Sequence, residues 1–271
     1  MLLDLDRFIN LLEEAGAAIL QFYTRPMSVI EKSDHSPLTS ADLASNKILL
    51  AGLQQLTPGI PILSEEGEPI PFELRSTWQQ YWVIDPLDGT RDFLAQTDEF
   101  CIGIALIQEG RAIVGAIHEP LSGITHFAQQ GQGVLKKAPC GSLEYLKRPL
   151  ACEQVRLLVS RQSPSQELHS FADQQQLPFL PCGSALKFIR LLEGRGELLL
   201  RLRPSAIWDI APGVCLVEEL GGQFLDLQQT PLSFMAEKNL LYPPFAAFLD
   251  PHYMASLWAP LETFLKCGLK S

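Results

Sequence analysis

Two acidic residues, Asp85 and Asp88, lie three positions apart in the segment 81–93, which reads YWVIDPLDGTRDF. Carboxylates about 4 Å apart repel each other by roughly 4 kcal/mol at an effective dielectric constant of about 20, so a site that contains both favours a bound cation. Oxygen ligands favour magnesium. Gly89 and Thr90 can begin a helix, and the free N–H groups at a helix start favour a phosphate group. The segment therefore predicts a magnesium-assisted site for a phosphate.

The residues before each acidic position indicate which elements present them. Residues 81–84 predict a short buried strand, which Pro86 is expected to end, so that Asp85 lies at the end of a strand. Residues 60–64 predict a second strand, which delivers Glu65 in the same way. If the two strands are parallel neighbours, both carboxylates lie at one edge of a sheet. Without that pairing, the residues from Asp85 to Asp88 are equally typical of a simple turn that closes a strand, and Glu65 is typical of a solvated surface.

Two further acidic residues are expected near helix starts. Thr39 or Ser40 is the expected N-cap of a helix that has Asp42 in its first turn. Pro212 is tolerated only near a helix start, which puts Asp209 at or beside the N-cap of a later helix. From position alone, each carboxylate needs no role beyond capping a helix or interacting with its dipole.

The composition narrows the class of protein. The chain has 271 residues and a formal net charge of −10, which argues against a surface that coats nucleic acid or an anionic membrane. Its 6 cysteines form no Cys-x-x-Cys pair, which argues against a zinc site and a disulfide framework. No apolar run reaches the ~20 residues of an integral membrane segment, so we expect a compact cytoplasmic protein.

The order of the predicted elements gives the fold class. The expected elements are amphipathic helices at 5–20 and 40–53, an antiparallel meander over 100–127, strands at 155–160 and 197–201, helices at 166–176 and 184–192, and a final helix at 251–265. A shift to proline, glycine and charge at 136–152 suggests a boundary near Ala151. This order predicts a layered α/β protein with an N-terminal half, 1–151, and a C-terminal half, 152–271.

Four segments, taken together, resemble the lithium-sensitive, magnesium-dependent phosphatases of the inositol monophosphatase superfamily, in the same order and at similar separations. They are Thr39-Ser40-Ala41-Asp42, Leu63-Ser64-Glu65-Glu66, Asp85-Pro86-Leu87-Asp88-Gly89-Thr90 and Trp208-Asp209-Ile210-Ala211. The resemblance covers nearly the whole chain and implies the family fold, an αβαβα sandwich. The runs 56–66, 157–161 and 183–188 are most similar to its bacterial branch of 3'(2'),5'-bisphosphate nucleotidases.

The resemblance implies a role for each residue of these motifs. One magnesium ion would be held by Glu65, Asp85 and the backbone carbonyl of Leu87, and a second by Asp85, Asp88 and Asp209. Glu65 would also act on a third, more weakly bound ion. Asp42 and Thr90 would position and deprotonate the attacking water, and the phosphate would rest on the N–H groups of Gly89 and Thr90. The substrate would thus touch Glu65, Leu87, Asp88, Gly89, Thr90 and Asp209.

The branch also implies a substrate, the small-molecule nucleotide adenosine 3',5'-bisphosphate, whose 3'-phosphate would be removed to give AMP. Its ribose, 5'-phosphate or base would be held by Ser160, Arg161, Ser184 and Lys187. The chain departs from the branch at 202–205, where Leu-Arg-Pro-Ser replaces a Phe-Gly-Pro-Thr-like run, so its nucleotide contacts are less firmly implied than its metal ligands. An inositol or sugar phosphatase, or a catalytically silent metal-binding protein, remains the alternative.

Overall fold

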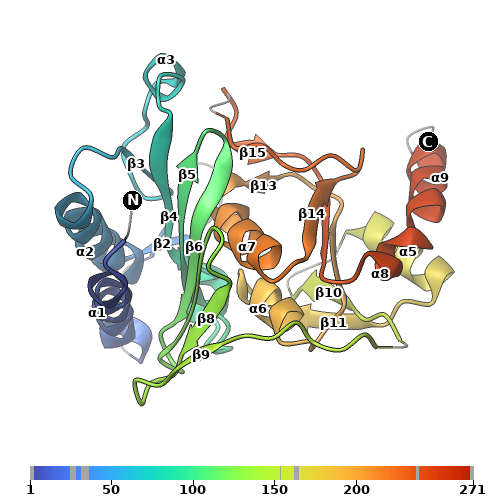
Figure 1. The fold of residues 1–271 in the computed structure, drawn as a ribbon, viewed down its shortest axis with the longest axis horizontal. Helices are drawn as coiled ribbons and strands as arrows, with labels where there is room; N and C mark the ends of the chain where they lie inside the picture. The colour runs from blue at the N-terminus through green and yellow to red at the C-terminus, as the bar shows by residue number, and fades with distance from the viewer. Residues whose placement is uncertain are drawn as a thin grey trace.

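The computed structural model describes residues 3–24, 29–31, 37–152, 154–161, 165–235 and 238–268. Figure 1 shows five layers. Helices α1 (Leu5–Tyr23) and α2 (Ser40–Leu56) cover one face of a seven-stranded sheet, and α6 (Leu186–Leu192) and α7 (Ile207–Glu219) lie between this sheet and a five-stranded one. The far side carries α5 (Gln166–Gln175), α8 (Pro251–Ala255) and α9 (Trp258–Gly268). This arrangement confirms the predicted αβαβα sandwich.

The seven-stranded sheet has its strands in chain order. They are β3 (Ile62–Ser64), β4 (Gln80–Asp88), β5 (Cys101–Gln108), β6 (Arg111–Glu119), β7 (Ile124–Gln129), β8 (Val134–Lys137) and β9 (Leu143–Tyr145). β3 and β4 are parallel, which is the pairing that the sequence had left as a condition, and every later pair is antiparallel, which confirms the meander. β8 and β9 extend the meander into a stretch whose composition had indicated a boundary.

The five-stranded sheet draws strands from distant parts of the second half. Its order is β11 (Phe179–Cys182), β10 (Leu157–Ser160), β12 (Leu198–Arg201), β16 (Phe245–Phe248) and β14 (Gln223–Asp226). β10 is parallel to β11 and β12, whereas β16 is antiparallel to β12 and β14. The short pairs β1 (Val29–Glu31) with β2 (Pro37–Thr39) and β13 (Ser205–Ala206) with β15 (Leu241–Tyr242), and helices α3 (Phe72–Arg75) and α4 (Thr90–Leu94), complete the described elements.

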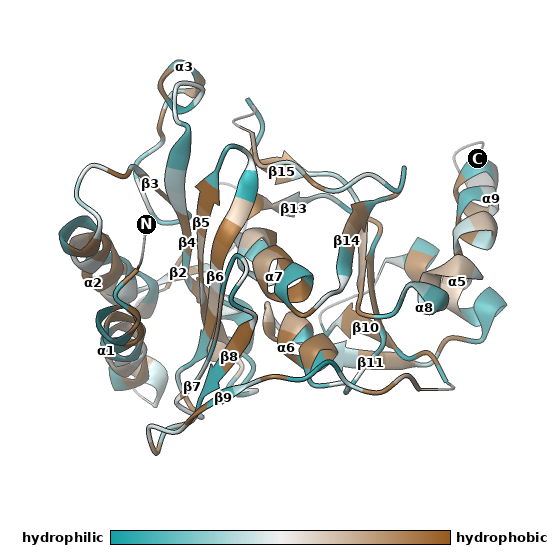
Figure 2. Ribbon diagram, viewed as in Figure 1, coloured by the Kyte–Doolittle hydropathy of each residue, from teal (hydrophilic) through white to brown (hydrophobic). Residues whose placement is uncertain are grey.

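The central helix α7 is held close to the first sheet by two glycines. A Cβ added to Gly115 would lie 2.5 Å from the carbonyl oxygen of Pro212, and one added to Gly103 would lie 3.2 Å from the Pro212 ring. The same Cβ on Gly103 would lie 3.8 Å from the Cβ of Asp85. Most of α7 is coloured as hydrophobic in Figure 2, as expected for a helix covered on both sides. The start of α7 is thereby fixed beside β4.

Three sequence expectations were wrong in detail. β4 does not end before Pro86 but continues to Asp88 through a bulge, in which Pro86 and Leu87 oppose one residue of β5, so the missing proline N–H breaks no ladder bond. Asp209 is the third residue of α7, not its N-cap, and Pro212 lies inside the helix. Packing against the glycines outweighs the cost of the proline.

The expected C-terminal helix is also divided. α8 ends at Ala255 and α9 begins at Trp258. Pro260 has no N–H to donate to a carbonyl one turn earlier, and its ring would clash with that carbonyl in a continuous helix. Pro260 therefore has to lie in the first turn of a new helix. Among the described residues, no helix is both long and apolar enough to cross a membrane.

Candidate metal and phosphate site

Three of the predicted metal ligands meet at one point. Asp85, Asp88 and Asp209 each place one carboxylate oxygen within 4.8 Å of those of the other two. Asp85 comes from the bulge of β4 and is 2% exposed, Asp88 ends the same strand, and Asp209 projects from the first turn of α7. The bulge matters because it turns both aspartates of one strand towards the same helix.

The electrostatics of the cluster show a surplus of negative charge. Burial raises the pKa of Asp88 to about 6, although Lys187 acts in the opposite direction. Burial, and then the charges of Asp88 and Glu65, raise the pKa of Asp209 to about 7. Burial and the neighbouring carboxylates raise the pKa of Asp85 well above its usual value. A hard divalent cation fits this all-oxygen donor set and would relieve the repulsion.

Glu65 and Leu87 flank the cluster. The Glu65 N–H donates to the Ile84 carbonyl (3.1 Å), which continues the pairing of β3 with β4 beyond the end of β3. The charge of Glu65 is the first neighbouring charge, after burial, that raises the pKa of Asp85. The Leu87 N–H donates to Asp85 Oδ1 (3.1 Å), and the Leu87 carbonyl accepts from the Thr90 hydroxyl (3.2 Å). Both residues therefore adjoin the three aspartates.

Asp42 caps the start of α2 and also contacts Thr90. Its Oδ2 accepts from the backbone N–H (2.8 Å) and the hydroxyl (2.5 Å) of Thr39, which forms a capping box at the start of α2. Its Oδ1 accepts from the Thr90 hydroxyl (3.2 Å). Asp42 is 1% exposed, and burial raises its pKa despite the hydrogen bonds from Thr39 and Thr90. The helix cap thus aims a proton-accepting group at Thr90.

A cavity of about 560 Å³ opens beside the acidic cluster. Its lining includes Asp88, Gly89, Thr90 and Asp209 together with all four predicted nucleotide-contact residues, Ser160, Arg161, Ser184 and Lys187. The Lys187 amino group donates to the Ser184 carbonyl (2.5 Å), and Ser184 has a left-handed φ of 50°. Arg161 lies in the lining with its guanidinium paired to Glu99. The structure therefore gathers the predicted residues around one space large enough for a nucleotide.

The polar lining residues that sequence reasoning did not assign to the site include Arg201, Arg203 and Ser205. Arg201 Nε and Ser205 Oγ are buried with no hydrogen-bond partner among the described residues. Arg201 ends β12, and its Nη1 is 3.5 Å from the Ser160 hydroxyl at the end of β10. The strand-end argument that identified Asp85 and Glu65 would have found Arg201 if applied to this strand.

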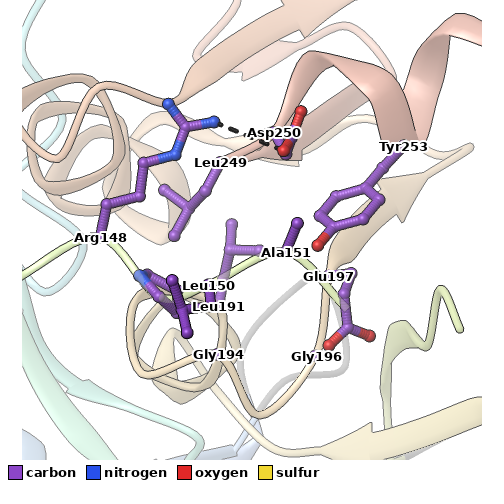
Figure 3. A pocket seen from close by; sticks show the side chains of 11 residues that line it. Arg148, Leu150, Ala151, Leu191, Gly194, Gly196, Glu197, Leu249, Asp250 and Tyr253 are labelled. Carbon is purple, nitrogen blue, oxygen red and sulfur yellow. Dashed lines mark ion pairs between the residues drawn. The ribbon is translucent and has the colours of Figure 1, made fainter. Parts of the chain in front are cut away.

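A second, smaller pocket lies away from these residues. Figure 3 shows it beside the segment 148–151, where Arg148 and Asp250 form an ion pair with an N–O distance of 3.9 Å. Its volume of about 20 Å³ leaves room for about one water molecule. It is too small for a phosphorylated metabolite.

Comparisons with known proteins identify the family of this chain. The sequence model of the inositol monophosphatase family matches residues 4–260. The 3'(2'),5'-bisphosphate nucleotidase CysQ of Escherichia coli K12 is 35% identical over 260 residues, which cover 94% of this chain and 100% of that protein. The CysQ of Haemophilus influenzae is 30% identical over 92% of this chain and 94% of its own length.

Solved structures show the same fold. The crystal structure of CysQ from Bacteroides thetaiotaomicron superposes with a TM-score of 0.80 at 27% identity, covering 90% of this chain and 97% of that one. The inositol monophosphatase of Thermotoga maritima gives a TM-score of 0.80 at 21% identity, over 97% of this chain and 98% of that one.

Proposed function

The chain belongs to the inositol monophosphatase family, and we propose that it is a magnesium-dependent phosphomonoesterase that converts adenosine 3',5'-bisphosphate to AMP and phosphate. The observation that carries the proposal is the cavity of about 560 Å³, which has metal-binding carboxylates in its lining together with cationic and hydroxyl side chains. Its relatives of about the same length named as 3'(2'),5'-bisphosphate nucleotidases support the choice of substrate.

The carboxylates are the groups that would hold the metal. We assign Glu65, Asp85 and the Leu87 carbonyl to one magnesium ion and Asp85, Asp88 and Asp209 to a second, with Glu65 also acting on a weaker third. When bound, the ions lower the pKa of a bound water and offset the charge that develops on the phosphate oxygens. Asp85 is assigned to both ions because it lies between Glu65, which follows β3, and Asp209, which belongs to α7.

Thr90 and Asp42 would handle the proton of the attacking water. The Thr90 hydroxyl accepts a hydrogen bond from the water while it donates its own proton to Asp42 Oδ1, which lies 3.2 Å away. The burial that raises the pKa of Asp42 makes it a better proton acceptor. The N–H groups at the start of α4, next to Gly89, would hold the phosphate in line with this water.

The remaining lining residues would hold the rest of the nucleotide. The assigned contacts are Ser160, Ser184, Lys187 and Arg161, and the unpaired Nε of Arg201 offers a further donor to an anion.

The assigned metal ligands come from both of the predicted halves, 1–151 and 152–271. This division and a cytoplasmic location stay predictions.

The test is phosphate release from a panel of monoesters with and without magnesium. We expect adenosine 3',5'-bisphosphate to be hydrolysed with a higher kcat/KM than inositol 1-phosphate, fructose 1,6-bisphosphate or p-nitrophenyl phosphate. Excess chelator should abolish turnover and lithium should reduce it. Preference for inositol 1-phosphate would replace the proposed substrate, and full turnover in chelator would reject the metal assignment.

A further inference from the structure

Glu99 joins three segments that surround the cavity. Its Oε2 accepts from the Gly183 N–H (2.6 Å) and from Arg161 Nε (2.8 Å), and its Oε1 lies 2.6 Å from Arg161 Nη2. The side chain is 15% exposed. Burial raises the pKa of Glu99, but the hydrogen bonds from Arg161 and Gly183 outweigh this effect and hold the pKa below its usual value. Glu99 is therefore an ionised group that ties the loop after α4 to the ends of β10 and β11.

Two glycines allow Glu99 to lie this close. A Cβ on Gly89 would be 2.8 Å from the Glu99 carbonyl oxygen, and a Cβ on Gly183 would be 2.9 Å from the Cβ of Glu99. Gly89 also precedes α4 with a left-handed φ of 92°. Glu99 thus packs against the phosphate-binding turn on one side and the β11–α6 turn on the other.

The β11–α6 turn in turn reaches the metal ligands. Ser184 has a φ of 50°, a left-handed conformation that is unfavourable for a residue with a side chain and persists only where its surroundings impose it. The next residue, Ala185, donates its N–H to Asp88 Oδ2 (2.5 Å). Lys187, whose charge lowers the pKa of Asp88 and Asp209, donates to the Ser184 carbonyl. A displacement of Gly183 would therefore be transmitted to Asp88.

We propose that Glu99 is a positioning residue, which acts through the Gly183 N–H to hold the Ser184–Lys187 turn against the metal cluster. The inference rests on the proposed function only for its choice of metal. Because the Arg161 guanidinium is engaged by that carboxylate, Arg161 orients Glu99 in addition to its assigned nucleotide contact. Glu99 itself is not among the residues that line the cavity, so it acts through its neighbours.

Glu197 provides a matched control. Its carboxylate accepts hydrogen bonds from the same kinds of donors, a backbone N–H and a guanidinium group. Here all of them belong to Arg156: the backbone N–H (2.7 Å), Nε (3.0 Å) and Nη2 (2.6 Å). This pair lies before β10 and β12, at the strand ends opposite to Ser160 and Arg201. Replacing Glu197 removes an equivalent clamp but leaves the metal site alone.

The experiment compares Glu99→Ala, Glu99→Gln, Arg161→Ala and Glu197→Ala for folding by circular dichroism, for Mg²⁺ binding from the rise in Tm with added metal, and for hydrolysis of p-nitrophenyl phosphate. We expect Glu99→Ala to weaken the apparent Mg²⁺ affinity about tenfold and to lower kcat, because Asp88 loses its support. Glu99→Gln should recover part of both, since its amide oxygen still accepts from Gly183. Arg161→Ala should be milder than Glu99→Ala, and Glu197→Ala should lower Tm alone.

Three results would overturn the inference. The first is an unchanged Mg²⁺ affinity in folded Glu99→Ala protein. The second is an equal loss of Mg²⁺ affinity in Glu197→Ala. The third is a full loss in Arg161→Ala with none in Glu99→Gln, which would make Arg161 the acting group. If Glu99→Ala does not fold, the comparison of Glu99→Gln with Arg161→Ala decides. The Mg²⁺ titration uses no nucleotide. If the wild-type protein does not hydrolyse adenosine 3',5'-bisphosphate, the proposed function is rejected, but the result of the Mg²⁺ titration still tests the role of Glu99.

Discussion

Replacing Asp88 with Asn is expected to stabilise the metal-free protein and to disable the enzyme. Asp88, Asp85 and Asp209 have carboxylate oxygens within 4.8 Å of one another, so each ionised pair repels by about 3.5 kcal/mol at an effective dielectric constant of about 20. Lys187 and the Ala185 N–H offset part of this repulsion for Asp88. We therefore expect the metal-free variant to gain about 1–3 kcal/mol in free energy of unfolding at pH 8.

The gain should depend on pH in a defined direction. The pKa of Asp88 is raised to about 6 in the folded protein, so its ionisation costs stability. That cost is absent below an unfolded pKa of about 4, grows as the pH rises from there to about 6, and is constant above it. The stability advantage of Asp88→Asn should follow the same curve, and saturating Mg²⁺ should reverse it, because only the wild type gains the full binding energy.

Urea unfolding in chelator and in saturating Mg²⁺, across this pH range, measures both effects. Asp173→Asn, an exposed change on α5, serves as the control and should leave stability unchanged. Phosphate release should be nearly abolished in Asp88→Asn at ordinary Mg²⁺ concentrations. The reasoning is refuted if the metal-free variant is less stable than wild type at pH 8, or if Mg²⁺ stabilises both proteins equally.

The other predictions concern proton transfer and substrate choice. Asp42→Asn and Thr90→Ala should each lower kcat strongly with little change in KM. The double variant should be no slower than the slower single variant, because the two residues act as a unit. Additive losses in steady-state assays would assign them separate roles. Asp42→Asn should also cost about 1 kcal/mol of stability, measured by urea unfolding, from its capping box. Lys187→Ala should raise KM for adenosine 3',5'-bisphosphate far more than for p-nitrophenyl phosphate; an equal rise for both would assign Lys187 to the fold or the metal site.

The sequence by itself determined the local elements of the site. Asp85, Asp88 and Thr90 are fixed relative to one another by a single strand and turn, and Thr39 and Asp42 by one helix start, so their relative positions follow from short spacing, whereas their proposed roles come from the resemblance to the family. The acidic residues at the ends of both runs raised the parallel pairing of β3 with β4 as a condition, and the structure shows this pairing, which brings Glu65 to Asp85. Contacts between residues close in sequence need little tertiary information.

Only the tertiary structure decided how distant segments meet. Asp209 reaches Asp85 because α7 packs on Gly103 and Gly115, and nothing in the sequence around Pro212 indicates those two glycines. β16 escaped prediction because all of its residues are buried, and a fully buried strand lacks the alternating pattern that marks a half-exposed one. β11 and β14 are edge strands of 4 residues each, which is too short a run to show a clear pattern. The contacts of Glu99 with Arg161 and Gly183 join residues far apart in the chain, and such pairings are set by the packing of whole layers rather than by local propensity.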